Sequence, residues 1–451
     1  MVLAERNVVA LLEWAAACSW EEVPHAARER IALVIGDDIA AMLAASGEPE
    51  VRAVQEGLAR RARAAEATLL ARGAPRVEMH DAAIGNGVAA SWAEMDEGYR
   101  KVPCHAGVYC LPALFAVAEK DGLTVREVLR AAVLGYEITA RFARAWHSII
   151  PPLHPHGLFN SVGGAAAVGL ARGLDAGTFA LAVTGAATMV SPGPYNHAIK
   201  GALVRNAWPA LGAVAGILAV DLAAAGIGGV PSSPLDVFEG CFGARTDAAQ
   251  LTEGLGRDWA VCDGYHKLYA CCQYSHSALD ALGEILARRP ELKGGERVAA
   301  VEVETHPRGM TLDNYEPRTT LAAKFSLPHA LAAALVYGHA GVEAFSAASL
   351  AEPRVAGLRR RVRMAPHPDV RPWPLDRPAR VTLVLEDGER ISASCESARG
   401  GPDRPFAEEE VRAKIRSLSA PLAPGLAAAL ARLGAEPDRK WPQWIASVFE
   451  G

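Results

Sequence analysis

Residues 381–395 read Val-Thr-Leu-Val-Leu-Glu-Asp-Gly-Glu-Arg-Ile-Ser-Ala-Ser-Cys, with apolar and polar side chains alternating on either side of a turn. Val381, Leu383 and Leu385 recur with a period of two, which is typical of a half-exposed strand. Asp387-Gly388 is a strong signal for a tight turn, and the alternation resumes beyond it. The segment therefore predicts a β-hairpin.

Further patterns on the N-terminal side of this hairpin extend it into a domain. Val301, Val303 and Thr305 alternate with glutamates, which predicts another half-exposed strand. A helical pattern covers residues 277–288 and ends before a proline. Together these elements predict a domain of mixed α and β structure over residues 261–403.

The rest of the chain has the patterns of helices. Thr124-Val125-Arg126-Glu127 is a capping box, which predicts a helix from there to about Trp146. The helical pattern returns at Glu408, so we expect residues 404–451 to pack on a helical domain of residues 1–260. The predicted fold class is α+β: a large all-helical domain built from both chain ends, and a smaller α+β domain.

The composition is that of a globular protein. Of 451 residues, 51% are hydrophobic and 22% are charged, and 46 Lys and Arg against 51 Asp and Glu give a net charge of −5. This balance is not that of a disordered chain. A mildly acidic chain without a dense stripe of Lys and Arg lacks the electrostatic footprint of a nucleic-acid-binding protein, so we expect no nucleic-acid partner.

Three features favour a soluble, cytoplasmic protein. The N-terminus carries Glu5 and Arg6 and no long apolar core, unlike a secretory signal. Residues 176–199 lack charged side chains, but Ser191-Pro192-Gly193-Pro194 interrupts them before the roughly 20 apolar residues that a membrane span needs. The eight cysteines include no C-x-x-C pair, so they predict neither a disulfide framework nor a metal cluster. We therefore expect no membrane association.

Histidine and lysine gather in one part of the sequence. Seven of the 13 histidines lie between positions 105 and 276, and Lys200 and Lys267 lie in the same span; the histidines are His105, His147, His154, His156, His197, His266 and His276. Histidine titrates nearest neutrality, and a lysine beside it can hold a carboxylate or complete a proton relay. The alternative for any single one is a structural role at a helix end or in the core.

Two of these histidines lie in loops that lead into helices. His154-Pro155-His156 follows Pro151-Pro152 and precedes a run of small residues, where a helix N-terminus favours an anionic substrate. His105 likewise precedes an apolar helix. The acidic run at residues 94–97 lies just upstream and can orient a histidine or accept a proton, although such a run can also be a solvated helix end.

Other functional motifs are absent or lack their structural context. The chain contains no Walker-type G-K-[ST] loop, no H-E-x-x-H and no G-x-S-x-G elbow. Gly85-Asn86-Gly87 follows no predicted strand, so we assign it to helix packing. His154 and His156 have no neighbouring set of carboxylates or thiols, and we predict no metal site. The proline-rich residues 366–374 have the composition of a loop.

Several motifs together resemble the MmgE/PrpD family over nearly the whole chain. Their order and spacing are specific, although no single motif is. They are Ala82–Gly87, Glu94–Arg100, His105-Ala106-Gly107 before Leu111-Pro112-Ala113, Leu134–Glu137, His154-Pro155, Lys200, Lys267–His276 and Ala323–Pro328.

The resemblance implies a large helical domain with a smaller α+β lid, a homodimer, and chemistry without a cofactor in the cleft between the domains. The family includes 2-methylcitrate dehydratase, cis-aconitate decarboxylase and iminodisuccinate epimerase. We therefore expect a lyase or isomerase that acts on a small di- or tricarboxylate by proton transfer next to a carboxylate. The alternatives are a non-catalytic carboxylate-binding relative and, with less support, a metal-dependent hydrolase.

The resemblance also implies site residues, position by position. The implied catalytic residues are His154, His105, Asp96, Lys200 and Lys267, and Glu94 and His276 are implied as substrate-binding residues. Four residues that are particular to this chain are further predicted to bind the substrate, namely His156, Arg100, Arg205 and His329. In this scheme lysines hold carboxylates, a histidine exchanges a proton and an acid sets its tautomer. His154 is preferred as the acid/base residue, and which of His154 and His105 is the base stays open.

The chain departs from the family pattern at four positions. Ala106 replaces a common proline, Arg205 a common glycine and His329 a usual tyrosine. Cys272 stands where the decarboxylase carries a histidine. These departures weaken the prediction of decarboxylation and leave the substrate open.

Overall fold

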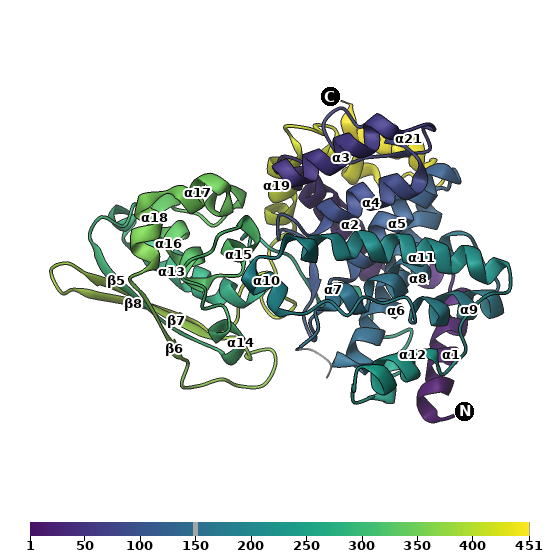
Figure 1. Ribbon diagram of the computed structural model, residues 1–451, viewed down its shortest axis with the longest axis horizontal. Coiled ribbons are helices and arrows are strands. Elements are labelled where there is room, and N and C mark those ends of the chain that lie inside the picture. The colour runs from purple at the N-terminus through teal and green to yellow at the C-terminus, as the bar shows by residue number, and fades with distance from the viewer. Residues whose placement is uncertain (148–151, 451) are drawn as a thin grey trace.

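The protein consists of a large helical body and a smaller body around a four-stranded sheet (Figure 1). The computed structural model describes residues 1–147 and 152–450, so Pro151 of the proline pair lies outside the described residues. The expected α+β fold class is confirmed. The helices of the large body before the sheet are α1 (Leu3–Ala17), α2 (His25–Ala45), α3 (Pro49–Arg61), α4 (Met79–Ala90), α5 (Ala106–Lys120), α6 (Val125–Ala145), α7 (Pro155–Leu158), α8 (Asn160–Ala171), α9 (Ala176–Ala186), α10 (Asn196–Lys200), α11 (Trp208–Ala224) and α12 (Ser233–Leu235).

The smaller body has strand order β6-β5-β7-β8, in which β5–β6 is parallel and the other pairs are antiparallel. The predicted hairpin is confirmed as β7 and β8, with Leu383 opposite Ile391 and with Gly388 in the left-handed region of the turn. Its strands are β5 (Val298–Thr305), β6 (Val362–Pro366), β7 (Ala379–Leu385) and β8 (Arg390–Cys395), and its helices are α13 (His276–Arg288), α14 (Pro307–Met310), α15 (Thr320–Lys324), α16 (Leu327–Tyr337), α17 (Ala347–Ala351) and α18 (Pro353–Arg359).

The end of the chain lies on the large body as α19 (Glu408–Ser419), α20 (Leu426–Arg432) and α21 (Trp441–Phe449) (Figure 1). Trp441 of α21 stacks on Phe115 of α5 at 5.1 Å between ring centroids. The two chain ends therefore share one core. The limits of the smaller domain at residues 261 and 403 stay a prediction.

The predicted capping box is confirmed at the start of α6. The Thr124 hydroxyl accepts a hydrogen bond from the Glu127 backbone N–H, and the Glu127 carboxylate accepts one from the Thr124 backbone N–H. Two otherwise unpaired donors at this helix end are thus satisfied.

Small residues let the central helices approach closely. A Cβ atom on Gly216 of α11 would lie 2.6 Å from the backbone nitrogen of Ala165 in α8, and one on Gly87 of α4 would lie 2.6 Å from Cα of Ala210. The packing role expected for the Gly85–Gly87 motif is therefore found at Gly87.

Among the described residues, one helical stretch, Leu203–Ala224, is by length and composition long and apolar enough to cross a membrane. More than half of its most apolar window, 56%, is buried inside the protein. Burial of that kind is the pattern of a core helix.

Replacing Gly216 by Ala should destabilise the helical body, because the added methyl group meets the α8 backbone, which cannot move aside as a flexible side chain can. Overpacking of this kind costs about 1–3 kcal/mol of unfolding free energy. Gly283→Ala on α13 is the matched control, since a Cβ there meets nothing within 4 Å and alanine favours the helix by roughly 0.5–1 kcal/mol. In thermal melting, Gly216→Ala should unfold at a lower temperature than the wild type, and Gly283→Ala should not. Equal transitions would contradict the close-packing argument.

Candidate active site

A cavity of about 40 Å³ is lined by side chains of both bodies. The charged and histidine side chains around it are Glu94, His105, His154, Arg205, Lys267 and Arg377. Aromatic rings form much of the remaining wall, namely Tyr99, Tyr195, Tyr265, Tyr274 and Phe325. Polar groups that converge in a concave, largely aromatic pocket make it the candidate active site.

A two-residue ladder brings the distant halves of this site together. Strand β3 (Gly98–Tyr99) pairs antiparallel with β4 (Gly264–Tyr265), and the backbone N–H of Arg100 donates to the carbonyl of Asp263. Gly98 is required there, because a Cβ atom on it would lie 2.4 Å from the Tyr265 ring. The ladder sets the acidic run at residues 94–97 beside Lys267.

The Lys267 ammonium lies between two buried carboxylates. Its Nζ is 3.2 Å from Glu94 Oε2 and 3.4 Å from Asp96 Oδ1. Burial lowers the pKa of Lys267, but Asp96 and Glu94 outweigh burial and raise that pKa above its ordinary value. Lys267 is therefore charged, and its charge is already paired within the protein.

Asp96 also holds His105 in one tautomer. His105 Nδ1 lies 2.6 Å from Asp96 Oδ2 and 2.8 Å from the carbonyl oxygen of Glu97. The Glu97 carbonyl accepts the hydrogen bond from Nδ1, and the Asp96 carboxylate lies at ion-pair distance on the same side of the ring. Neither group can donate a proton, so Nδ1 carries the proton and Nε2 keeps its lone pair. Burial raises the pKa of Asp96, but Lys267 and His105 hold it well below its usual range, so Asp96 stays ionised. This pair has the geometry of an oriented general base.

Glu94 pairs with Arg205 as well as with Lys267. Its Oε1 is 2.6 Å from Arg205 Nη1, and the guanidinium lies over the Phe325 ring. Glu94 adopts a φ of 52°, which is uncommon for a residue with a side chain. Such backbone strain persists only where the surroundings enforce it, and it is typical of functional sites.

His154 and His156 form a neutral pair of rings beside His105. His154 Nδ1 accepts a hydrogen bond from the His156 backbone N–H, and Arg205 Nε lies 3.3 Å from His154 Nε2. Burial and then Arg205 lower the pKa of both histidines well below its ordinary value. His156 Nδ1 is 2.8 Å from the Tyr109 hydroxyl, and its buried Nε2 has no partner among the described residues. Neither ring is suited to hold a positive charge.

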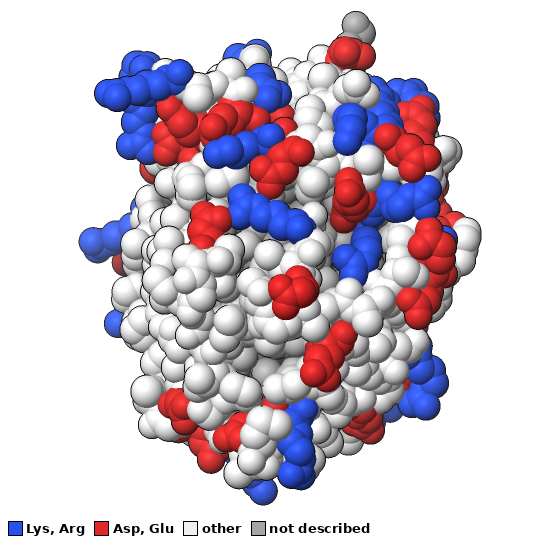
Figure 2. Space-filling view, turned by 90° about the vertical axis from the view of Figure 1, so that its right-hand side faces the viewer, with Lys and Arg blue, Asp and Glu red and all other residues white. Residues whose placement is uncertain are grey.

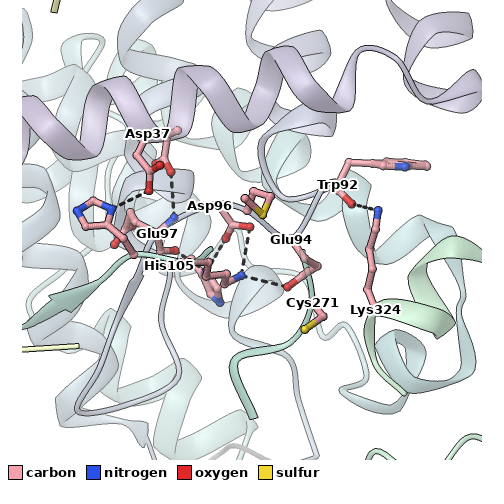
Figure 3. Close-up of polar contacts among 12 residues, drawn as sticks. Asp37, Trp92, Glu94, Asp96, Glu97, His105, Cys271 and Lys324 are labelled. Atoms are coloured by element: carbon pink, nitrogen blue, oxygen red, sulfur yellow. Dashed lines mark hydrogen bonds and ion pairs between the residues drawn. The ribbon is translucent and has the colours of Figure 1, made fainter. Parts of the chain in front are cut away.

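Three lysines from separate segments converge on the loop that carries the acidic run. Besides Lys267, Lys324 of α15 donates to the Trp92 carbonyl at 2.7 Å, and Lys414 of α19 donates to the Met95 carbonyl at 2.6 Å. The chain has only eight lysines, so this convergence uses three of them. Figure 3 shows Lys324 at Trp92 on one side of the loop, with Asp96 and His105 near its centre and Asp37 of α2 beyond.

Glu97 is held behind His105 by neutral donors. Its carboxylate accepts hydrogen bonds from the Gly107 backbone N–H at 2.7 Å and from the Tyr136 hydroxyl at 2.8 Å. Asp38 of α2 accepts a hydrogen bond from the Glu97 backbone N–H at 3.2 Å. Burial raises the pKa of Glu97 to about 7 and that of Asp38 well above its ordinary value.

The structure brings some of the expected site residues together and leaves others apart. Lys200 ends α10 and is exposed, and it does not line the cavity. The other five that lie outside the cavity wall are buried, and two of them, Asp96 and His156, contact His105 of the wall. The remaining three lie farther from it. His276 faces the Cys271 carbonyl, His329 contacts Ala344, Ser349 and Arg359 within the smaller body, and Arg100 binds Asp376.

The sequence interpretation missed several cavity residues. Tyr265 and Tyr274 lie close in the sequence to predicted site residues, but nothing in the spacing of the tyrosines marks these two as site residues. Arg377 follows the proline-rich loop that was interpreted as connecting sequence only. Within residues 1–147 and 152–450, no group of three or more His, Cys, Asp or Glu is arranged to hold a metal ion.

Comparison with known proteins adds a family to this geometry. The profile of the MmgE/PrpD N-terminal domain matches residues 9–253, and that of the MmgE/PrpD C-terminal domain matches residues 269–432. The chain is 25% identical over 370 residues to cis-aconitate decarboxylase of Aspergillus terreus, covering 75% of this chain and 74% of that protein. It is also 25% identical over 380 residues to the cis-aconitate decarboxylase-like protein oryM of Aspergillus oryzae (strain ATCC 42149 / RIB 40), covering 75% of each.

Glu97→Gln should make stability less dependent on pH. The pKa of Glu97 is about 7 in the folded protein against 4.5 ordinarily, so between these values the folded state binds the extra proton. The free energy of unfolding of the wild type therefore falls as pH rises from about 4.5 to about 7. Glutamine has no such proton, so the melting temperature of the variant relative to the wild type should rise from pH 5 to pH 8.

The exposed Glu284→Gln on α13 serves as the control, and its melting temperature should follow that of the wild type at every pH. Parallel pH profiles for Glu97→Gln and the wild type would contradict a protonated Glu97 in the folded state.

Proposed function

The chain belongs to the MmgE/PrpD family, and we propose that it is a lyase or isomerase that moves a proton next to a carboxylate of a small di- or tricarboxylate. The observation that carries this proposal is the Asp96–His105 pair, because His105, held through its Nδ1, lines a cavity whose wall also includes three cationic side chains. The family resemblance further implies chemistry that needs no cofactor, and the cysteine pattern favours the cytoplasm.

Different residues of the site can carry out the separate steps of such a reaction. Asp96 keeps the His105 proton on Nδ1, so Nε2 can take a proton from a carbon acid. Negative charge then develops on the substrate next to its carboxylate. The hydroxyl groups of the cavity tyrosines can donate hydrogen bonds to that charge, and the neighbouring cations stabilise it.

One relative named above is a cis-aconitate decarboxylase, which is a carboxy-lyase, and the other is a cis-aconitate decarboxylase-like protein. At 25% identity to these relatives, the type of lyase cannot be assigned to this chain from them directly. Cys272, which lines the cavity, stands where we expect a histidine in a decarboxylase, and burial raises the pKa of its thiol to about 11. A thiol that stays protonated at neutral pH is a weak proton donor, which favours dehydration or epimerisation over decarboxylation for this chain.

His105→Gln should abolish most of the proton transfer, because glutamine cannot accept the proton. Removing a general base costs roughly 10²–10⁴-fold in rate. Proton NMR in D₂O with iminodisuccinate, 2-methylcitrate and cis-aconitate measures deuterium exchange, loss of water and loss of carbon dioxide in one spectrum.

The control is His25→Gln, since the His25 side chain is 84% exposed and remote from the cavity, and this variant should keep the wild-type rate. Full turnover by His105→Gln would remove His105 from the mechanism. Binding of these acids with no change in any spectrum would favour the alternative of a non-catalytic carboxylate-binding relative.

We also propose that the protein forms a homodimer through the outer face of α11. Leu211 and Leu218 lie two turns apart on that face and are 54% and 46% exposed, and Val204 just before the helix is 56% exposed. Figure 2 views the helical body from the side remote from the sheet, and its middle carries few charged side chains. Several exposed large apolar side chains on one helix face are typical of protein interfaces.

Leu218→Glu should convert the dimer into a monomer, because an unpaired carboxylate would be buried in the interface. Light scattering coupled to gel filtration measures the mass directly. Val370→Glu, at a 41% exposed position of the smaller body, should leave the dimer intact. A wild type with the mass of one chain would contradict the proposal.

A further inference from the structure

Arg377 is a cationic residue of the cavity that the smaller body supplies. It lies in the loop between β6 and β7, is 5% exposed, and lines the cavity beside Gln273 and Tyr274. Its guanidinium lies 5.0 Å from the centre of the Tyr274 ring, and its Nη1 donates to Gln273 Oε1. The Ser277 hydroxyl donates to the Arg377 backbone carbonyl at 2.5 Å. The residue is therefore held in place from both its backbone and its side chain.

The hydrogen-bonding capacity of this guanidinium is largely unused. Nε lies 3.3 Å from Asp376 Oδ2, but its N–H is buried and makes no hydrogen bond within the described part of the chain. Arginine presents its donors in a rigid fork that matches a carboxylate. Buried donors without acceptors are costly, so a group that supplies acceptors there binds favourably.

The charges around the cavity leave one cation in excess. Arg205 and Lys267 are matched by Glu94 and Asp96. Asp376, in contrast, faces two guanidinium groups, because its Oδ1 also binds Arg100 Nη2 at 2.7 Å. Arg100 and Arg377 carry two positive charges and Asp376 carries one negative charge, so one positive charge is left unmatched. Of these three residues, Arg377 lines the cavity.

We propose that Arg377 binds a carboxylate of the substrate from the smaller body, opposite the Asp96–His105 base on the helical body. This assignment rests on the proposed function. Arg205 and Lys267 then serve mainly to hold Glu94 and Asp96, and they are not the principal carboxylate-binding residues. One excess charge matches one carboxylate, so a second carboxylate of the substrate meets neutral donors such as the cavity tyrosines.

Calorimetric titration with citraconate and with its dimethyl ester tests this assignment. Arg377→Gln should weaken citraconate binding by about 10–100-fold, since a charged hydrogen-bonding partner is lost, and should leave any binding of the ester unchanged. Arg377→Lys keeps the charge without the fork and should fall between the wild type and Arg377→Gln. Melting curves establish that each variant is folded, and Arg377→Lys carries the test if Arg377→Gln does not fold.

Arg308→Gln is the matched control. The Arg308 guanidinium also packs on Tyr274, at 5.6 Å, but it does not line the cavity, so citraconate affinity should change less than about twofold. Equal losses in both variants would show that the effect passes through Tyr274 and would overturn the assignment.

The two proposals fail differently. Equal binding of citraconate to the wild type and to Arg377→Gln would leave the proposed function standing and overturn the role of Arg377. No binding of citraconate, cis-aconitate or crotonate to the wild type would contradict the proposed function, and the assignment to Arg377 with it.

Discussion

The rest of the site depends on the Lys267 ammonium, which is buried between the carboxylates of Glu94 and Asp96. A buried charge without a partner is very costly, so each of these three groups requires the other two in place. The pairing sets Asp96 beside His105 and allows Glu94 to keep its left-handed backbone conformation. Removing one member would leave the other buried charges uncompensated.

The surrounding structure holds this pairing from several directions. The β3–β4 ladder joins residues 98–99 to residues 264–265, and Lys324 and Lys414 bind carbonyl groups of the same loop from the smaller body and from the C-terminal helices. Folding of both bodies is therefore coupled to the position of the loop. The charged side chains around this loop meet only when all of these segments are in place. The folded protein therefore holds the site pre-organised before a substrate arrives.

The two bodies contribute different chemistry to the cavity. The helical body supplies the oriented His105 base and the neutral histidine rings, whereas the smaller body supplies Phe325 and Arg377. The proposed division places proton transfer on one side and carboxylate binding on the other. In such an arrangement, the wall supplied by the smaller body can change without moving the base and its acid.

The sequence by itself determined the elements and the fold class, because the signals for them are local. The alternation in residues 381–395 and the Thr124–Glu127 capping box involve neighbours a few residues apart, and both are found in the structure. The acidic run and His105 were also identifiable, since they lie within about ten residues of each other. Only the tertiary structure decided that Lys267 pairs with Glu94, 173 residues away, that Lys200 is exposed, and that Arg377 reaches the cavity. These outcomes depend on how helices and loops from both bodies pack, and hydrophobic periodicity carries no information about which polar side chains will then face one another.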